Sequence, residues 1–232
     1  MPMKWWGWGE EEETFHLPDP EGFWAYVGSR LGETRESPRI DSLEKADVRA
    51  SRLEGRDLEA LRRAAGDAAV STEAAVRAVH SFGKSYCDAV RLRRGEVANP
   101  TDVVVWPETD EQVASILDEA AERGISVVPF GGGTSVVGGL EATPDRPCVT
   151  VHLGRLSRVV AVDPIAGTAV AQAGILGPAL EQQLSAHGFT LGHFPQSFQY
   201  SSLGGWIATR SGGQKSTLYG KVEERVHSLR MI

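Results

Sequence analysis

The sequence predicts an α+β protein in which a mostly helical N-terminal region precedes a region of short strands, helices and glycine-rich loops. Residues 19–98 are rich in helix-forming side chains with amphipathic spacing, whereas the chain beyond Asn99 alternates β-branched runs with helical segments. At 232 residues the chain suits one large domain or two small ones. The pair Asn99-Pro100 is typical of a boundary, so we expect residues 1–98 and residues 99–232 to be separate regions.

Composition and charge exclude several classes of protein. A hydrophobic content of 41% and a charged content of 24% are ordinary for a soluble globular protein. The net charge of −7 argues against binding to nucleic acid or to an anionic membrane surface. The two cysteines are isolated, which favours a reducing compartment and hence a cytoplasmic protein. The sequence contains no run of the roughly 18 apolar residues that a transmembrane helix needs.

Three tryptophans, Trp5, Trp6 and Trp8, lie within the first eight residues. Because a large indole ring is costly to leave in water, we expect an arm that packs its rings on another part of the protein. The alternative is a partner-facing or lipid-facing anchor, which would place the protein at the periphery of a membrane. The acidic run from Glu10 to Glu13 argues against a secretory or organellar leader.

The N-terminal region is expected to contain several helices. Pro20 suits the first turn of a helix that ends at Gly32. Residues 49–65 are rich in Arg, Leu, Glu and Ala, which are good helix formers. The pair Ser71-Thr72 is expected to cap a further helix.

Beyond Asn99 the pattern predicts strands, helices and loops in alternation. Thr109 followed by Gln112 is a capping-box pattern at the start of a helix, and Gly124 is a suitable stop. The expected elements are a strand at 103–106, a helix from 109 to 124, strands at 125–128 and 149–153, a hairpin of 159–162 with 168–173, a helix at 177–188 and a short helix at 203–209. Residues 226–232 have the pattern of a strand, so we expect a truncated or partial protein whose sheet continues past Ile232.

A triple glycine, Gly131 to Gly133, follows the strand at 125–128 and leads into Thr134 and Ser135. Glycine lets another group approach the backbone closely, and successive backbone N–H groups in such a loop form an anion site. The alternative interpretation is that these glycines only turn the chain between strands. We expect the loop to hold the phosphates of a cofactor.

Two other phosphate-binding motifs are excluded. A P-loop needs a Lys-Ser or Lys-Thr pair after its second glycine, and Leu140 stands at that place. The dinucleotide fingerprint needs a glycine where Val136 stands, and it needs a helix directly after the loop. Residues 141–147 contain two prolines and do not predict such a helix. Any phosphates must therefore be held mainly by the amides and hydroxyls of the loop itself.

The glycine loop, with the run from Asn99 to Pro107 ahead of it, resembles the PCMH-type FAD-binding domain of the vanillyl-alcohol oxidase and p-cresol methylhydroxylase flavoproteins. Within that family, two further stretches resemble the alkylglycerone-phosphate synthases (alkyldihydroxyacetonephosphate synthases). These stretches are Lys4-Trp5-Trp6-Gly7-Trp8-Gly9 and the combination of Gly192-His193-Phe194-Pro195-Gln196-Ser197 with residues 201–212. The resemblance implies an FAD-binding domain of two small α/β subdomains, preceded by the helical N-terminal region.

The resemblance also implies which residues bind FAD. The residues expected around the diphosphate are Phe130, Gly131, Gly132, Gly133, Thr134, Ser135 and Val136. The residues expected along the rest of the cofactor are Gln196, Ser197, Phe198, Gln199, Tyr200, Ser201, Ser202, Thr209, Arg210, Ser211 and Gly212. Gln196 departs from the family, because the synthases tend to have an acidic residue there. The glycine loop contains neither His nor Cys, so we expect FAD to be bound non-covalently.

Two enzymatic functions follow from the resemblance. The first is that of the synthases, which act in ether-lipid synthesis: an acyl group on glycerone phosphate is exchanged for a fatty alcohol through the flavin, with no net redox change. The alternative is an FAD-linked oxidoreductase that passes a hydride from a 2-hydroxy acid, such as lactate or glycolate, to the flavin. A non-catalytic FAD-binding remnant is the third hypothesis.

In such enzymes the catalytic residues lie in a C-terminal part. We therefore expect them beyond Ile232 and expect this fragment alone to be inactive. The implied substrate is a small or lipid-like molecule, and a homodimer is the expected assembly.

A few polar side chains have two interpretations each. His193 either packs within its loop or contacts the flavin or its phosphates. Arg210 and Lys215 are either solvated or face an anionic ligand, and the same alternatives hold for the cluster of Arg91, Arg93 and Arg94. Cys148 is expected to be a buried strand cysteine. The histidines lack metal-ligand spacing, so no metal site is expected.

Overall fold

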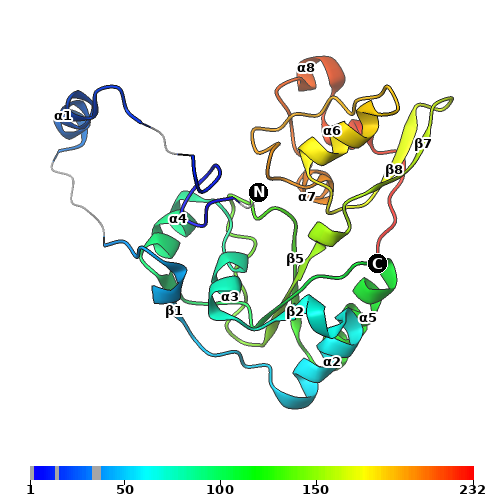
Figure 1. The fold of residues 1–232 in the computed structure, drawn as a ribbon, viewed down its shortest axis with the longest axis horizontal. Helices are drawn as coiled ribbons and strands as arrows, with labels where there is room; N and C mark the ends of the chain where they lie inside the picture. The colour runs from blue at the N-terminus through cyan, green and yellow to red at the C-terminus, as the bar shows by residue number, and fades with distance from the viewer. Residues whose placement is uncertain (1–2, 14–15, 33–37) are drawn as a thin grey trace.

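The computed structural model describes residues 3–13, 16–32 and 38–232. Figure 1 shows two packed parts: a larger one built around the sheet with β2 and β5, and a smaller one with α6, α7 and the β7–β8 hairpin. In chain order the elements are α1 (Pro20–Leu31), η1 (Leu43–Lys45), β1 (Asp47–Val48), α2 (Gly55–Ala65), η2 (Asp67–Ala69), β2 (Val70–Ser71), α3 (Ala74–His80), α4 (Tyr86–Arg93), β3 (Glu96–Val97), β4 (Val103–Val105), α5 (Asp110–Glu122), β5 (Ser126–Phe130), β6 (Cys148–His152), η3 (Leu153–Arg155), β7 (Val159–Asp163), β8 (Thr168–Ala171), α6 (Gly177–Ser185), α7 (Leu203–Ala208), α8 (Ser216–Tyr219) and η4 (Val222–Arg225). This arrangement confirms the predicted α+β class with two small subdomains.

The sheet of the larger part has the strand order β2-β4-β6-β5. Strands β4, β6 and β5 are parallel, and β2 runs antiparallel to β4. Buried valines fill β4 completely, as is typical of a parallel strand that is covered on both faces. Because Phe130 pairs with His152, β5 and β6 end side by side. The glycine loop that follows β5 therefore leaves the sheet at its carboxyl edge.

Helices α2 and α5 pack against each other and, together with strands β4 and β6, supply most of the core of the larger part. The side chain of Thr109 accepts a hydrogen bond from the Gln112 amide at 3.2 Å and caps α5, as the sequence predicts. Gly124 adopts a φ of +62° just past the helix and ends it. The buried members of this core are Leu53, Leu61, Ala64, Ala65, Ala69, Val103, Val105, Ile116, Ala120, Ile125, Val149 and Val151.

The smaller part has its own core, formed by Ile175, Leu180, Leu184, Trp206 and Val222. These residues come from α6, α7, η4 and the segment before α6. The β7–β8 hairpin is antiparallel, and helices α6 and α7 lie where the sequence predicts them. The larger and the smaller part thus have separate cores, which explains the two-part shape in Figure 1. A third buried cluster consists of Ala78, Phe82, Leu92 and Val97.

The chain before the predicted boundary contributes directly to the larger part. Strand β2 pairs with β4, and the buried carboxylate of Asp102 binds the side chains of Arg49 and Arg52 at 2.6 Å and 2.9 Å. The same carboxylate accepts a hydrogen bond from the Cys148 amide at 2.9 Å. Residues on both sides of Asn99 thus share one sheet and one buried ion cluster. The proposed division at residue 99 stays a prediction.

Three local predictions are wrong. Residues 49–54 are not helical, because Arg49 and Arg52 bind Asp102 and the helix starts only at Gly55. The helix after Ser71 has Glu73 as its N-cap residue, and the Ser71 hydroxyl instead accepts a hydrogen bond from the Glu73 amide at 3.2 Å. Residues 226–232, all of them described, form no strand; they run back to α5, where Arg230 forms an ion pair with Asp110 at 2.9 Å.

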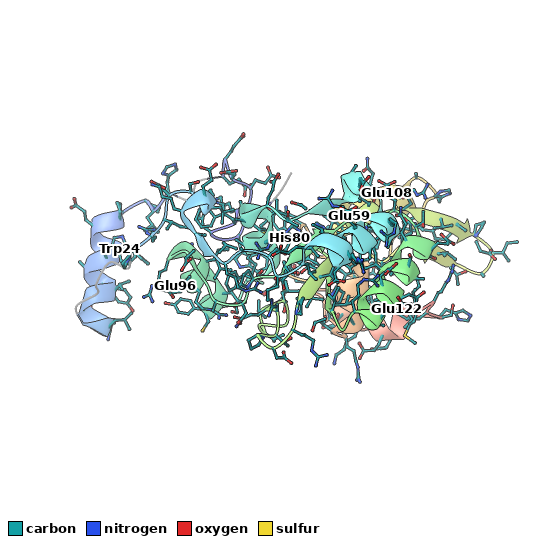
Figure 2. The ribbon with its side chains drawn as sticks, turned by 90° about the horizontal axis from the view of Figure 1, so that it is seen from below. Trp24, Glu59, His80, Glu96, Glu108 and Glu122 are labelled. Carbon is teal, nitrogen blue, oxygen red and sulfur yellow. The ribbon has the colours of Figure 1, made fainter. Side chains whose placement is uncertain are left out.

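Helix α1 stands apart from the rest of the molecule in Figure 1 and buries none of its residues. Its bounds, with Pro20 in the first turn and Gly32 at the end, are those predicted. Figure 2 shows Trp24 on this helix far from the body of the molecule. Within the described ranges, no helix is both long and apolar enough to cross a membrane.

Candidate cofactor site

The glycine loop begins where the buried ring of Phe130 ends β5. Gly133 adopts a φ of +67°, a conformation that favours glycine, and a Cβ placed there would lie 2.6 Å from Cζ of Phe130. Phe130 thus packs beneath the turn and supports it from the sheet side. The third glycine is needed for the shape of the loop itself.

The first two glycines serve a different purpose, because they touch residues 196–202, the second stretch expected to bind FAD, which is called the second loop below. A Cβ on Gly132 would lie 1.4 Å from the carbonyl oxygen of Tyr200, and one on Gly131 would lie 2.1 Å from the hydroxyl of Ser202. No side chain larger than hydrogen fits at either place without moving a neighbour. The structure therefore brings together loops that lie far apart in the sequence.

The backbone amides of the glycine loop are available to a ligand. In the described part of the chain, no amide from Gly132 to Val136 donates a hydrogen bond to another protein group. Backbone N–H groups that are neither paired nor fully solvated favour an anionic acceptor. These unpaired donors could hold the diphosphate of a cofactor, and the role of the Thr134 and Ser135 hydroxyls in that site stays a prediction.

The second loop forms a compact turn whose serines have structural partners. The Ser201 hydroxyl donates to the Ser197 carbonyl at 2.8 Å and accepts the indole N–H of Trp206 at 2.6 Å. Ser202 is the N-cap residue of α7, and its hydroxyl accepts from the Gly205 amide. Phe198 stacks on Trp206 in the core of the smaller part. Ser201, Ser202 and Phe198 therefore hold the second loop in its conformation through contacts within the protein.

The third predicted loop, residues 209–212, follows α7. Thr209 ends the helix by donating its hydroxyl to the Gly205 carbonyl at 2.8 Å. Arg210 is exposed and adopts a φ of +50°, the one positive φ among the described residues other than glycine. The hydroxyl oxygen of Ser211 lies 2.7 Å from Nε2 of His193, within hydrogen-bond distance. Gly212 has open space around its α-carbon.

His193 is buried beside this third loop. Its ring packs edge-on against Trp206, and burial lowers the pKa of its imidazole. Its Nδ1 is buried without a hydrogen-bond partner among the described residues. One ring nitrogen therefore holds the third loop through Ser211, and the other is a buried polar atom that this structure leaves without a partner among the described residues.

The three loops meet at a cavity of about 740 Å³. Seven predicted site residues line it: Thr134, Val136, Gln196, Ser197, Gln199, Tyr200 and Gly212. The other predicted residues are not among those that line it: Phe130, Gly131, Gly132, Gly133, Ser135, Phe198, Ser201, Ser202, Thr209, Arg210 and Ser211. Three further lining residues, Trp8, Gly9 and Glu13, are not among the predicted ones and come from the N-terminal arm.

The electrostatics of the cavity are simple. Of the residues that line it, Glu13 alone carries a charge. The pKa of Tyr200 is raised by its partial burial and by the nearby carboxylates of Glu13 and Glu10. Among the described residues that line the cavity there is no Lys or Arg, so the groups there that could interact with an anionic ligand are backbone N–H groups and hydroxyls.

The remaining candidate side chains have partners elsewhere. Arg91 binds Asp88 at 2.8 Å and Glu141 at 3.2 Å, which favours a structural role over contact with an anionic substrate. Lys215 lies over the ring of Phe194 at 4.7 Å from its centroid. Cys148 is buried, as predicted, and burial raises the pKa of its thiol to about 11. The described residues contain no group of three or more His, Cys, Asp or Glu side chains that could hold a metal ion.

Comparison with known proteins identifies the family. The model of the FAD binding domain matches residues 101–232. The chain therefore belongs to the FAD binding domain family, and FAD is the cofactor of this domain. The match covers β4, β5, β6, the three loops and the smaller part, whereas the cavity-lining residues Trp8, Gly9 and Glu13 lie outside it.

Individual relatives extend this finding. The chain is 40% identical over 166 residues to the alkyldihydroxyacetonephosphate synthase of Trypanosoma brucei brucei, a match that covers 70% of this chain and 27% of the relative. It is 36% identical over 133 residues to an uncharacterized FAD-linked oxidoreductase of Escherichia coli (strain K12), which covers 57% of this chain and 27% of that protein. A solved alkyldihydroxyacetonephosphate synthase matches 96% of this chain and 46% of its own, with 31% identity and a TM-score of 0.85.

These comparisons confirm the predicted resemblance, the fold and the cofactor. They also place both synthases and oxidoreductases among FAD-dependent enzymes similar to this chain. The chain spans about a quarter of the length of the curated synthases that it matches.

Proposed function

We propose that this chain is the FAD-binding part of a flavoenzyme that acts as an alkyldihydroxyacetonephosphate synthase. The observation that carries the proposal is the meeting of three loops around one cavity, with Thr134 and Val136 of the glycine loop on its wall. Among the described residues, the amides from Gly132 to Val136 have no protein acceptor. The likeness to the solved synthase supports it, because that likeness extends over nearly the whole chain, including the N-terminal region outside the FAD-binding match.

Each part of the site has a distinct task in this proposal. The amides of the glycine loop bind the diphosphate, and the Gln196–Tyr200 turn lines the remainder of the cofactor. His193 positions the third loop through the contact between its Nε2 and the Ser211 hydroxyl. Bound FAD supplies the reactive flavin ring. FAD is held without a covalent link, since the glycine loop has neither His nor Cys.

The proposed reaction replaces the acyl group of an acyl dihydroxyacetone phosphate with a fatty alcohol and releases a fatty acid. No hydride is lost or gained overall. The residues that act on the substrate lie outside this chain, which alone is inactive. In this proposal the protein works in the cytoplasm or at the periphery of a membrane, in ether-lipid synthesis, as a homodimer.

The second candidate is an FAD-linked oxidoreductase of a 2-hydroxy acid. The similarity to the Escherichia coli oxidoreductase and, at 32% identity over 139 residues, to a mitochondrial D-lactate dehydrogenase of Arabidopsis thaliana favours it. The N-terminal arm favours the synthase instead: its tryptophans lie in the stretch Lys4-Trp5-Trp6-Gly7-Trp8-Gly9, which carries the sequence resemblance to the synthases.

The decisive experiment uses the complete protein that carries this chain, loaded with FAD. Incubation with acyl dihydroxyacetone phosphate and a labelled fatty alcohol should give labelled alkyl product, with the visible flavin absorption unchanged at the end. D-Lactate and glycolate should leave the flavin oxidised under anaerobic conditions. Bleaching by a 2-hydroxy acid, without alkyl product, would refute the synthase and establish the oxidoreductase.

A further inference from the structure

The N-terminal arm (residues 3–13) is a closed loop with a defined shape. Met3 and Glu10 form an antiparallel bridge, and the Lys4 amide donates to the Gly9 carbonyl at 2.9 Å. Gly9 turns the chain with a φ of +93°. The side chain of Lys4 also donates to the Glu13 carbonyl and so holds the end of the arm.

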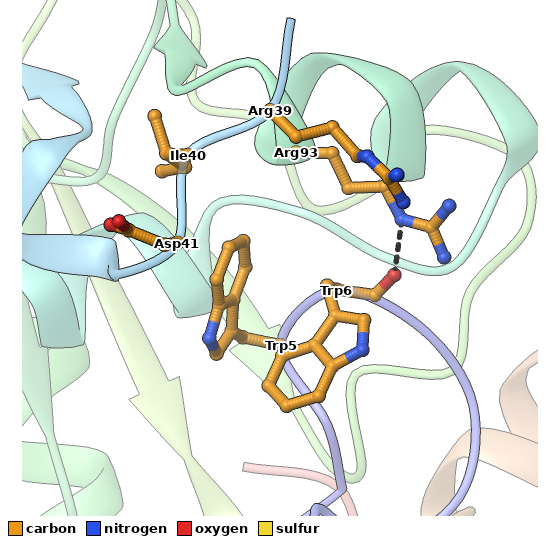
Figure 3. Close-up of a pocket in the computed structure, with 6 residues that line it drawn as sticks. All are labelled: Trp5, Trp6, Arg39, Ile40, Asp41 and Arg93. Atoms are coloured by element: carbon orange, nitrogen blue, oxygen red, sulfur yellow. Dashed lines mark hydrogen bonds between the residues drawn. The ribbon is translucent and has the colours of Figure 1, made fainter. Parts of the chain in front are cut away.

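One side of the arm is fixed to the body of the molecule. Arg93 donates through Nε to the Trp6 carbonyl at 2.6 Å, and Figure 3 shows this bond beside the rings of Trp5 and Trp6. The Trp5 ring packs against the core cluster that contains Phe82 and Leu92. This confirms the predicted arm that packs a tryptophan on another part of the protein.

Lys84 connects the arm to the glycine loop. Its ammonium group donates to the Lys4 carbonyl at 2.6 Å, and its backbone amide donates to the Ser135 carbonyl at 2.6 Å. Burial lowers the pKa of Lys84 to about 8, so the group is still mostly protonated at pH 7. Gly83 permits this close approach, because a Cβ there would lie 2.0 Å from the Ser135 carbonyl oxygen. One residue thus positions both the arm and the phosphate-binding turn.

The other side of the arm faces the cofactor cavity. Trp8, Gly9 and Glu13 line the cavity together with Thr134 and the Gln196–Tyr200 turn. Trp8 leaves 42% of its surface exposed, although its neighbours Trp5 and Trp6 are better covered. An indole ring held over a cavity by a fixed backbone offers a flat apolar surface to a planar ligand.

We propose that the N-terminal arm is a wall of the FAD site, in which Trp8 packs against a ring of the bound cofactor and Lys84 holds the arm in place. The inference rests on the proposed FAD binding. Glu13 determines which part of FAD faces the arm, because a carboxylate repels the diphosphate. The diphosphate therefore lies at the amides of the glycine loop, and a ring system of the cofactor lies at Trp8.

Trp8→Ala is the direct test, with Trp24→Ala as the matched control. Trp24 is 59% exposed and lies on α1, which buries nothing, so it has no route to the cavity. Apoprotein is titrated with FAD, and the quenching of flavin fluorescence gives Kd. We expect Trp8→Ala to raise Kd by about tenfold or more, Trp8→Phe to retain most of the affinity, and Trp24→Ala to match the wild type. Equal Kd values for Trp8→Ala, Trp24→Ala and wild type would refute the role of the arm.

A second measurement separates loss of the arm from loss of the fold. Lys84→Met removes the ammonium anchor but keeps the backbone bond to Ser135; Lys45→Met is the control, since Lys45 pairs with Asp41 on the surface. In wild type, FAD should slow cleavage by a Glu-specific protease within Glu10–Glu13. In Lys84→Met, cleavage should be fast with or without FAD, at an unchanged far-UV circular dichroism spectrum. If wild-type protein binds FAD but is cleaved at the same rate with and without it, the role of the arm is refuted. If wild-type protein binds no FAD, the proposed function itself is refuted.

Discussion

The α-carbon of Gly132 lies directly against the carbonyl oxygen of Tyr200, so that a Cβ on Gly132 would come within 1.4 Å of it. This contact joins the glycine loop at the end of β5 to the turn that precedes α7. The two loops belong to different parts of the molecule with separate cores. The cofactor cavity therefore depends on a backbone contact that any side chain at position 132 would break.

Gly132→Ala should disrupt this contact. The added methyl group must push the two loops apart, and we expect the free energy of unfolding to fall by about 2 kcal/mol, as for other overpacked sites. FAD binding should weaken with it, because the Gln196–Tyr200 turn no longer faces the glycine loop. Thermal unfolding and FAD titration measure both effects.

Gly28→Ala is the control for this substitution, because Gly28 lies within α1 and has no atom within 4 Å of an added Cβ. It should change neither the unfolding midpoint of the main body nor the affinity for FAD. A Gly132→Ala protein that melts like wild type and binds stoichiometric FAD would show that the two loops are not packed as described.

Two predicted site residues of the second loop should behave differently when replaced by alanine. Ser201→Ala removes the acceptor of the buried Trp206 indole N–H and should cost about 1–3 kcal/mol of stability. Gln199 is exposed and lines the cavity, so Gln199→Ala should weaken FAD binding without lowering the unfolding midpoint. Parallel denaturant melts and FAD titrations compare the two variants; the reverse pattern would contradict the division into lining and supporting residues.

Acid should destabilise the protein through Asp102. Burial raises the pKa of this carboxyl, but the hydrogen bonds from Arg49 and Arg52 outweigh burial and hold it well below its ordinary value of 3.8. A carboxyl with a lowered pKa contributes stability that is fully present above its unfolded pKa and is lost as pH falls below that value. The free energy of unfolding should therefore drop as pH falls from about 5 toward 2.

Asp102→Asn should remove part of this pH dependence. At pH 7 it should cost about 3 kcal/mol, because two arginines lose a buried partner. Its unfolding free energy should then fall less steeply with acid than that of wild type. Asp41→Asn breaks an exposed pair with Lys45 and should have almost no effect. Identical acid slopes for Asp102→Asn and wild type would assign the acid sensitivity to other groups.

The affinity for FAD should depend little on salt. Glu13 is the one charged residue among those that line the cavity, and neither Arg210 nor Lys215 belongs to them. Amide donors in a partly enclosed turn are screened less than exposed charges, so Kd should change by less than about threefold between about 0.05 and 0.5 M salt. Arg210→Gln and Lys215→Gln should leave Kd unchanged. A large loss of affinity in either variant would place that side chain on the diphosphate.

Much of the fold follows from local signals in the sequence. The capping pair Thr109 and Gln112 and the stop at Gly124 locate α5. The run of valines at 103–105 predicts a strand, and all three valines are buried in β4. The sequence places the start of α2 too early, because Arg49 and Arg52 are good helix formers. In the structure they bind Asp102, which is distant in the sequence, and the helix starts at Gly55. The C-terminal segment has a strand-like pattern, but residues 226–232 belong to no sheet.

The site could be predicted only in part for the same reason. The triple glycine indicates a turn near a ligand, but only the folded chain shows that Gly132 is required by Tyr200. The tryptophan cluster predicts that the arm packs on the protein, and nothing local indicates that Trp8 reaches the cavity. Both features depend on contacts between segments that are distant in the sequence. Periodicity and motif spacing do not predict such contacts.

The flavin content of the purified protein shows whether the three loops form an FAD site. We predict that the chain, reconstituted with FAD and freed of excess by gel filtration, retains one FAD per chain that is released intact on denaturation. Release of free FAD would also establish non-covalent binding. A folded protein that shows no flavin absorption and takes up no added FAD would contradict this assignment, because the three loops would then form a cavity for another ligand.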